Sequence, residues 1–349
     1  MLTKSNYNQY LQCQKLLWIA KNKKELIPEP SETTKATFDQ GYEVENYARK
    51  LFGKGREVKE NFQKGKEETK QYINDGVTLI FQATAMPKDL LARSDIFKYN
   101  KKTKSWDIYE VKSSTKVKEE HIPDLCFQKI AFERDGYKIG KTYLIHINSK
   151  YIRKGKIEPK KLFIIEDISE QVGNYRSTAE ANIPKAIKLI SQTTEPVCGI
   201  GKHCKNPYEC PLKELCWGSL PKYSVHYLQR ITEQKLQSLK DMGIQKIIDI
   251  PDNFELTEGQ RNQIEVTRSG KPMIDTDSIA RTLNNLEYPL YFLDYETYGS
   301  AIPLFDGTSP YQQVCFQYSL HVIRSQEAEI EHYEFLHTDQ ENPMKKLLL

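Results

Sequence analysis

The spacing of apolar residues predicts helices at the start of the chain and a run of strands after them. Two helices are expected, over residues 2–20 and Thr37–Phe52, because their apolar residues recur every three or four positions and so share a helix face. The pattern then changes to apolar or alternating runs that are typical of strands, expected at Val77–Ala85, Leu90–Tyr99, Trp106–Ser113 and Thr142–Ile147. A helical repeat over Ile122–Asp135 interrupts them, so the pattern predicts a mixed α/β fold.

The second half of the chain follows a different plan. A helix is expected over Thr178–Ile190, and a cysteine-rich stretch follows at residues 196–218. Residues 224–251 have the apolar spacing of two helices joined by a turn, and a strongly apolar strand begins at about residue 288. At about 150 residues per domain, a chain of 349 residues is expected to hold two or three units. We expect them at residues 1–220, 221–285 and 286–349.

Composition places the chain among globular proteins, since 38% of its residues are hydrophobic and 28% are charged. The formal net charge of +4 is weak for this length, so it permits a polyanionic partner without requiring one. Lysines and arginines cluster around residues 101–118 and 150–161. Each cluster is either a solvated face or a surface that contacts nucleic acid.

No stretch approaches the roughly 18 consecutive apolar residues of a membrane-spanning helix. The first residues also lack the apolar centre of a signal peptide. The sequence therefore predicts a cytoplasmic protein without a membrane partner. In that compartment, seven cysteines are expected to be thiols or ligands of a metal or cluster rather than disulfides.

A carboxylate–lysine pattern lies on two of the expected strands. Asp95 is on one strand, and Glu110 and Lys112 are on another, in the pattern D-x14-E-V-K. Because Glu110 and Lys112 are two residues apart, their side chains point to the same face of the strand. Two carboxylates suit a hard divalent cation, and a lysine beside it can stabilise developing negative charge. The alternative is a solvated strand face, although the apolar neighbours of Asp95 make burial of a lone carboxylate costly.

These residues resemble the PD-(D/E)XK nuclease superfamily, and within it the RecB-like branch. Gly41-Tyr-Glu-Val-Glu45 is similar to an upstream element of that branch, and Gln128 in CFQKIAF is similar to a downstream one. The resemblance implies a restriction-endonuclease-like core. It implies Mg²⁺ or Mn²⁺ held by Glu45, Asp95, Glu110 and the Val111 carbonyl. It also implies that Lys112 is the catalytic lysine and that Gln128 supports the site. Glu45 stands where many members have histidine, and Phe132 where tyrosine is frequent.

Four cysteines, Cys198, Cys204, Cys210 and Cys216, recur at six-residue intervals in a segment poor in core-forming residues. Such a segment needs a metal or cluster to hold it. The spacing lacks the close cysteine pairs usual for zinc, whereas iron–sulfur clusters accept looser spacing, so both readings stay open. Together with Cys13, the last three resemble the cluster cysteines of RecB-like nucleases. That resemblance implies a [4Fe–4S] cluster held by Cys13, Cys204, Cys210 and Cys216 that staples the helical ends of the core. A local set that uses Cys198 is the alternative.

Two further elements lie in the later units. Residues 224–251 resemble a helix–hairpin–helix with Met242-Gly243-Ile244 at its turn, a motif that contacts phosphates; the alternative is a generic helical linker. Asp294 and Glu296 share a face of an apolar strand and resemble the first metal-binding motif of DnaQ-like exonucleases with the ribonuclease H fold. We expect residues 286–349 to be the incomplete start of such a domain. The alternative is an acidic pair without metal.

Together these features predict a metal-dependent DNA nuclease that hydrolyses phosphodiester bonds, on single strands or at DNA ends, in repair, recombination or defence. Its expected cofactors are Mg²⁺ or Mn²⁺ and a [4Fe–4S] cluster. RNA stays an alternative substrate. A nucleic-acid-binding module without cleavage and a metal-held interaction protein are the alternative functions.

Overall fold

The computed structural model describes residues 1–347. The chain forms two compact units, each of which is described by itself. The first comprises Met1–Val197, Phe292–His321 and His332–Leu349, and the second comprises Cys198–Tyr291 and Val322–Glu331.

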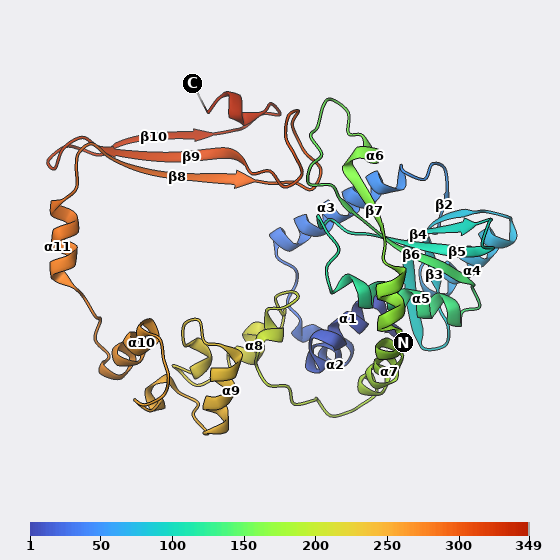
Figure 1. The fold of residues 1–349 in the computed structure, drawn as a ribbon, viewed down its shortest axis with the longest axis horizontal. Coiled ribbons are helices and arrows are strands. Elements are labelled where there is room, and N and C mark those ends of the chain that lie inside the picture. The colour runs from blue at the N-terminus through green and yellow to red at the C-terminus, as the bar shows by residue number, and fades with distance from the viewer. Residues whose placement is uncertain (348–349) are drawn as a thin grey trace. The chain divides into compact units, whose positions relative to one another are not determined.

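The first unit is built on a seven-stranded mixed sheet (Figure 1). Its strands are β1 (Leu2–Thr3), β2 (Arg56–Glu57), β3 (Leu79–Ala85), β4 (Leu90–Asn100), β5 (Ser105–Val111), β6 (Ile139–Ile147) and β7 (Phe163–Asp167). Strands β3, β4 and β5 are antiparallel neighbours, whereas β6 lies parallel to β5. The parallel pair requires a crossover connection, and α5 (His121–Arg134) supplies it.

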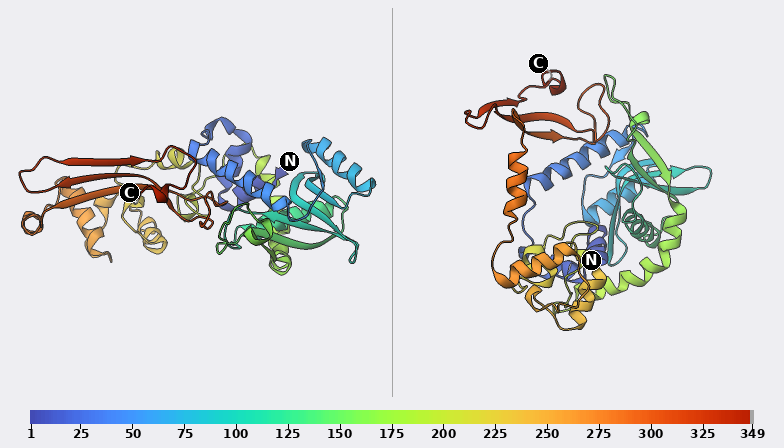
Figure 2. Two further views of the ribbon diagram at one scale, coloured as in Figure 1. Left: turned by 90° about the horizontal axis from the view of Figure 1, so that it is seen from above. Right: turned by 60° about the vertical axis from the view of Figure 1, so that its left-hand side comes forward.

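Helices cover both faces of this sheet (Figure 2). Phe97 of β4 packs against Phe132 of α5, with ring centroids 4.6 Å apart. Its neighbour Ile96 points to the opposite face and packs in a core with Val44 of α3 (Glu32–Arg49). Since successive strand residues face opposite sides, α5 and α3 lie on opposite faces of the sheet. The remaining helices of the unit are α1 (Lys4–Gln12), α2 (Gln14–Asn22), α4 (Phe62–Asn74), α6 (Pro159–Leu162) and α7 (Ser169–Ile190).

The N-terminal helices are held at the α5 side of the sheet. Helix α1 packs against α5, and α2 packs against α7. The Trp18 indole donates a hydrogen bond to the Gln192 carbonyl (2.8 Å), and Lys15 forms an ion pair with Glu195 (2.9 Å). These contacts tie the first 22 residues to the end of α7, far away in the sequence.

The structure confirms the mixed α/β class and each of the four expected strands of the first unit, with small shifts at their ends. The expected single helix over residues 2–20 is wrong in detail. Residues 2–3 pair with β4, and the helix breaks at Cys13, whose backbone is extended (φ −159°, ψ 124°). The helix expected at Thr178–Ile190 begins earlier, at Ser169, and continues through Pro184.

The second unit is helical and has a small core of its own. Its helices are α8 (Lys213–Trp217), α9 (Glu233–Asp241), α10 (Glu258–Ser269) and α11 (Thr276–Asn284). The helix–hairpin–helix expected over residues 224–251 is wrong in its second half. Between α9 and residue 251 the chain forms only a three-residue 3-10 turn, at Ile247–Asp249. Pro251 comes two residues later and disfavours helix in the residue before it. The apolar residues Ile247 and Ile250 instead pack as part of the core of this unit.

A second sheet has three strands in the order β10-β9-β8. They are β8 (Leu290–Tyr298), β9 (Val314–Ile323) and β10 (Glu331–Leu336), so the apolar strand expected near residue 288 is confirmed. The connection after β8 joins the main core of the first unit through Ala301 and Ile302, which are buried. Across the described chain, no helix has both the length and the apolar character required to cross a membrane.

Candidate functional site

The four predicted residues of the carboxylate–lysine site converge where β4, β5 and α5 meet. They are Asp95, Glu110, Lys112 and Gln128. Asp95 lies on β4 and Glu110 near the end of β5, and Ile96 pairs with Tyr109 between them. The Val111 N–H donates to Asp95 Oδ2 (2.8 Å). Gln128, fully buried on α5, donates from Nε2 to Glu110 Oε2 (2.7 Å). Strand register and the crossover helix therefore build this cluster.

Glu110 lies at the centre of the cluster and is only 2% exposed. Its Oε1 accepts hydrogen bonds from two ammonium groups, Lys112 Nζ (2.8 Å) and Lys4 Nζ (2.7 Å). Lys112 also donates to Asp124 Oδ2 at 2.6 Å. The site is thus a compact group of two lysines and two buried carboxylates, with Asp95 and Gln128 at its edge.

Opposite electrostatic effects act on the two strand carboxylates. Burial would raise the pKa of Glu110, but the charges of Lys112 and Lys4 outweigh it and hold that pKa well below its usual range. Burial, together with the negative charge of Glu110, raises the pKa of Asp95 to about 8. Because the two carboxylates repel each other, a divalent cation placed between them would be electrostatically favourable.

Glu45 reaches the same region from α3. Gln82 Nε2 donates to Glu45 Oε1 (2.6 Å) and lies 3.4 Å from Asp95 Oδ1, so one amide links the two carboxylates. Arg49, one helical turn after Glu45, also donates to Glu45 Oε1 at 2.6 and 3.0 Å. Glu45 is thus near Asp95 but is held by an arginine.

Four residues of this region were not indicated by the sequence pattern: Lys4, Asp124, Gln82 and Arg49. Asp124 had a usable signal, since it precedes Gln128 by one helical turn and so shares its face of α5. Lys4 had none, because its partner Glu110 lies 106 residues away.

The donor chemistry of Asp95, Glu110 and Glu45 fits a divalent cation, since carboxylate oxygens are the ligands such ions prefer. The Val111 carbonyl belongs to the same strand end as Glu110. Within residues 1–347, however, no three His, Cys, Asp or Glu side chains are arranged to hold a metal ion. At this site, Lys4 and Lys112 contact Glu110, and Arg49 contacts Glu45. Metal binding at this site would therefore require these cations to rearrange.

Three of the predicted cluster cysteines gather in the second unit. Cys204 and Cys210 are buried, and the Cys210 N–H donates to the Cys204 carbonyl (2.9 Å). Burial raises the pKa of the Cys210 thiol, and the nearby Cys204 and Cys216 sulfurs raise it further. Cys13 belongs to the first unit, at the break between α1 and α2. Each of the seven cysteines is outside any disulfide in the described structure.

The second acidic pair lies on β8. Asp294 and Glu296 are both exposed and two residues apart on this strand, so they share one face. The structure places them on one strand, as the sequence predicted, with Gln317, Tyr318 and Ser319 on the neighbouring β9.

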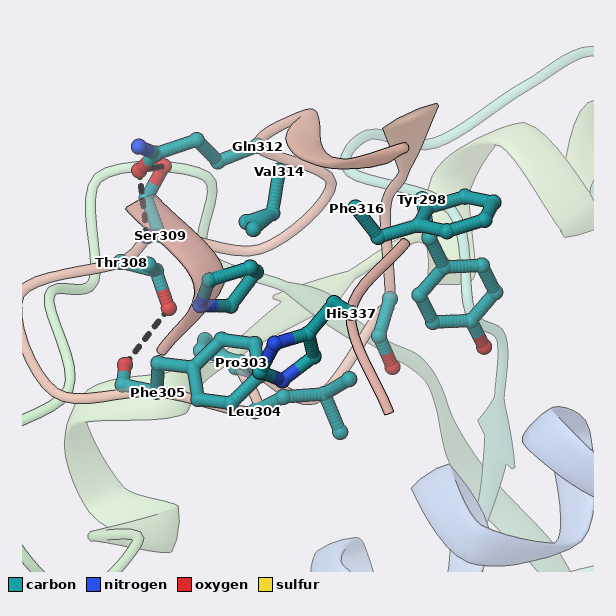
Figure 3. A pocket seen from close by; sticks show the side chains of 12 residues that line it. Tyr298, Pro303, Leu304, Phe305, Thr308, Ser309, Gln312, Val314, Phe316 and His337 are labelled. Atoms are coloured by element: carbon teal, nitrogen blue, oxygen red, sulfur yellow. Dashed lines mark hydrogen bonds between the residues drawn. The ribbon is translucent and has the colours of Figure 1, made fainter. Parts of the chain in front are cut away.

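An apolar cavity of about 340 Å³ lies where the ends of β8 and β9 meet the connection between them (Figure 3). Aromatic and aliphatic side chains form most of its wall, and His337, which follows β10, also lines it. Two lining residues are held by hydrogen bonds: Thr308 Oγ1 donates to the Phe305 carbonyl (2.6 Å), and the Ser309 N–H donates to Gln312 Oε1 (3.0 Å).

One protein family matches part of the chain. Residues 291–349 match the family described as a domain of unknown function, DUF2779. The matched segment contains most of the three-stranded sheet and lies outside the cluster around Glu110. A search of curated proteins found no similar sequence.

Proposed function

We propose that the first unit is a metal-dependent nuclease whose centre contains Asp95, Glu110, Lys112 and Gln128. The observation that carries the proposal is the meeting of a buried glutamate, a lysine two residues later and a buried glutamine at one point of a mixed sheet. Their order along the chain resembles the RecB-like PD-(D/E)XK pattern.

Each of these side chains has a role in the proposed reaction. Asp95 and Glu110, with Glu45 and the Val111 carbonyl, would hold Mg²⁺ or Mn²⁺, which supplies Lewis-acid stabilisation of a phosphodiester under attack. Gln128 fixes the Glu110 carboxylate through its hydrogen bond at 2.7 Å. Lys112, whose side chain is 26% exposed and is held by Glu110 and Asp124, would place a positive charge beside a bound phosphate.

The substrate proposed from the resemblance is DNA, as single strands or ends. The test is cleavage of end-labelled single-stranded DNA, double-stranded DNA and RNA by the purified full chain, with Mn²⁺ or Mg²⁺ and with excess EDTA. We expect cleavage of single-stranded DNA that EDTA abolishes, because the paired carboxylates need a divalent cation to act on phosphate. Salt-dependent binding without cleavage would instead identify a binding module.

We also propose that Cys13, Cys204, Cys210 and Cys216 hold a [4Fe–4S] cluster with a structural role. The gathering of three of these cysteines in a segment with few apolar residues supports it. Protein purified without oxygen is expected to be brown and to contain about four iron atoms per chain. The Cys13→Ser change should lower iron content sharply, whereas Cys198→Ser should not. Stoichiometric zinc without iron would contradict the cluster, and the reverse effect of the two serine variants would identify the local ligand set.

We further infer that residues 286–349 belong to a DnaQ-like domain with the ribonuclease H fold, in which Asp294 and Glu296 would bind a divalent cation. The three-stranded sheet and the exposed acidic pair on β8 support this proposal.

A further inference from the structure

Contacts of the N-terminal residues 2–7 place Lys4 at the proposed nuclease centre. Leu2 pairs with Leu90 of β4 and is fully buried. On the other side, the Tyr7 ring stacks on Phe127 of α5, with centroids 5.2 Å apart. The backbone around Lys4 is therefore fixed from both directions, while its long side chain is 24% exposed and has several rotatable bonds.

The hydrogen bonds of Glu110 leave little room for a metal ion. Its Oε1 already accepts from Lys4 and Lys112, and its Oε2 accepts from Gln128. A carboxylate offers about four lone-pair sites, and three of them are taken. A cation that binds Glu110 at Oε1 must therefore displace one of the two lysines.

A second carboxylate oxygen, Asp124 Oδ1, lies near the Lys4 ammonium. Asp124 Oδ1 is buried and has no hydrogen-bond partner among the described residues, although Oδ2 of the same carboxylate accepts from Lys112. Lys4 Nζ lies 3.7 Å from this Oδ1, so a movement of about 1 Å would bring it to hydrogen-bond distance. An unpaired buried acceptor is unfavourable, so the new bond to Asp124 Oδ1 would offset part of the cost of breaking the Lys4–Glu110 bond.

We propose that Lys4 is a two-position counterion of the nuclease centre. It neutralises Glu110 in the metal-free protein and moves to Asp124 Oδ1 when a divalent cation takes its place on Glu110. Lys112 is less suited to leave, because it holds both carboxylates at 2.8 and 2.6 Å. Lys4 is thus a positioning residue that keeps a positive charge at the centre in both states. This inference rests on the proposed metal-dependent function.

The test is a direct Mn²⁺ titration without nucleic acid, in which electron paramagnetic resonance measures free Mn²⁺. The full chain is compared with Lys4→Met, Asp124→Asn and the double variant. We expect Lys4→Met to tighten Mn²⁺ binding about tenfold, a coupling typical of residues in contact. Asp124→Asn should weaken it about tenfold in the wild-type background, since Lys4 then has no charged acceptor to move to. In the Lys4→Met background, Asp124→Asn should change affinity less than about threefold.

Lys66→Met is the matched control, because Lys66 forms a similarly buried pair with Asp135 (2.5 Å) away from the centre. It should leave Mn²⁺ affinity unchanged. Equal weakening by Asp124→Asn with and without Lys4 would overturn the inference. If the Asp124 variant does not fold, Lys112→Met replaces it in the comparison. A simple charge effect predicts that Lys112→Met and Lys4→Met tighten binding equally, whereas the two-position counterion predicts a clearly larger effect of Lys4→Met.

The two proposals fail differently. If Asp95→Asn and Glu110→Gln leave Mn²⁺ binding unchanged, the proposed metal site itself is wrong. If those variants abolish binding while Lys4 and Asp124 act additively, only the movement of Lys4 is wrong.

Discussion

Replacing Lys112 with methionine is expected to lower the rate of DNA cleavage by about 10³-fold, the effect of removing one charge-stabilising donor from a catalytic centre. Methionine keeps the length and apolar stem of the side chain but removes the ammonium that Glu110 and Asp124 hold at 2.8 and 2.6 Å. These two contacts fix the position of the Lys112 ammonium. A cation from the solvent would not be held in the same geometry after the ammonium is removed. Initial rates on labelled single-stranded DNA with saturating Mn²⁺ measure the effect.

The control for this variant is Lys141→Met, in the same unit. Lys141 pairs with Asp167 at 2.6 Å on the protein surface and has a 58% exposed side chain, so its loss should leave cleavage unchanged. Circular dichroism of both variants checks that the fold is kept. Full activity of a folded Lys112→Met protein would rule out the assignment of this centre.

Replacing Phe97 with alanine is expected to destabilise the first unit by about 3–5 kcal/mol, the usual range for a buried aromatic residue. Phe97 is fully buried, and its ring stacks on Trp106 of β5 at 4.5 Å and lies 4.6 Å from Phe132 of α5. Alanine would leave a cavity between the sheet and the helix that carries Asp124 and Gln128. Hydrogen exchange of the β4 and β5 amides measures the change in opening free energy for this sheet alone.

Phe38→Ala provides the comparison, because Phe38 on α3 is 53% exposed. An exposed side chain of this kind should change stability by less than about 0.5 kcal/mol. A loss below about 1 kcal/mol for Phe97→Ala would mean that the β4–α5 contact relaxes to close the cavity. In that case the aromatic cluster would not be what holds α5 against the sheet.

The local pattern of the sequence was enough to predict the strands and part of the centre. Strand periodicity put Glu110 and Lys112 on one face, and the structure has both side chains at one point. Helical spacing placed Gln128 on α5, where it now binds Glu110. The local pattern gave a wrong prediction, a helix, at residues 247–250. Their apolar side chains suggested a helix, but they pack in a 3-10 turn within the core of the second unit.

Contacts between distant segments could not be predicted in this way. Lys4 meets Glu110 only because β1 pairs with β4 and α1 packs on α5. The link from Glu45 through Gln82 to Asp95 joins a helix to two strands, and each step depends on how they pack.

The sequence by itself determined most of the element types and placed Glu110 and Lys112 on one face of a strand, because side-chain periodicity is a property of neighbouring residues. The tertiary structure alone decided which charges meet there, because pairing of groups far apart in the sequence depends on sheet register and helix packing. It thereby revealed Lys4 and Asp124 as members of the centre.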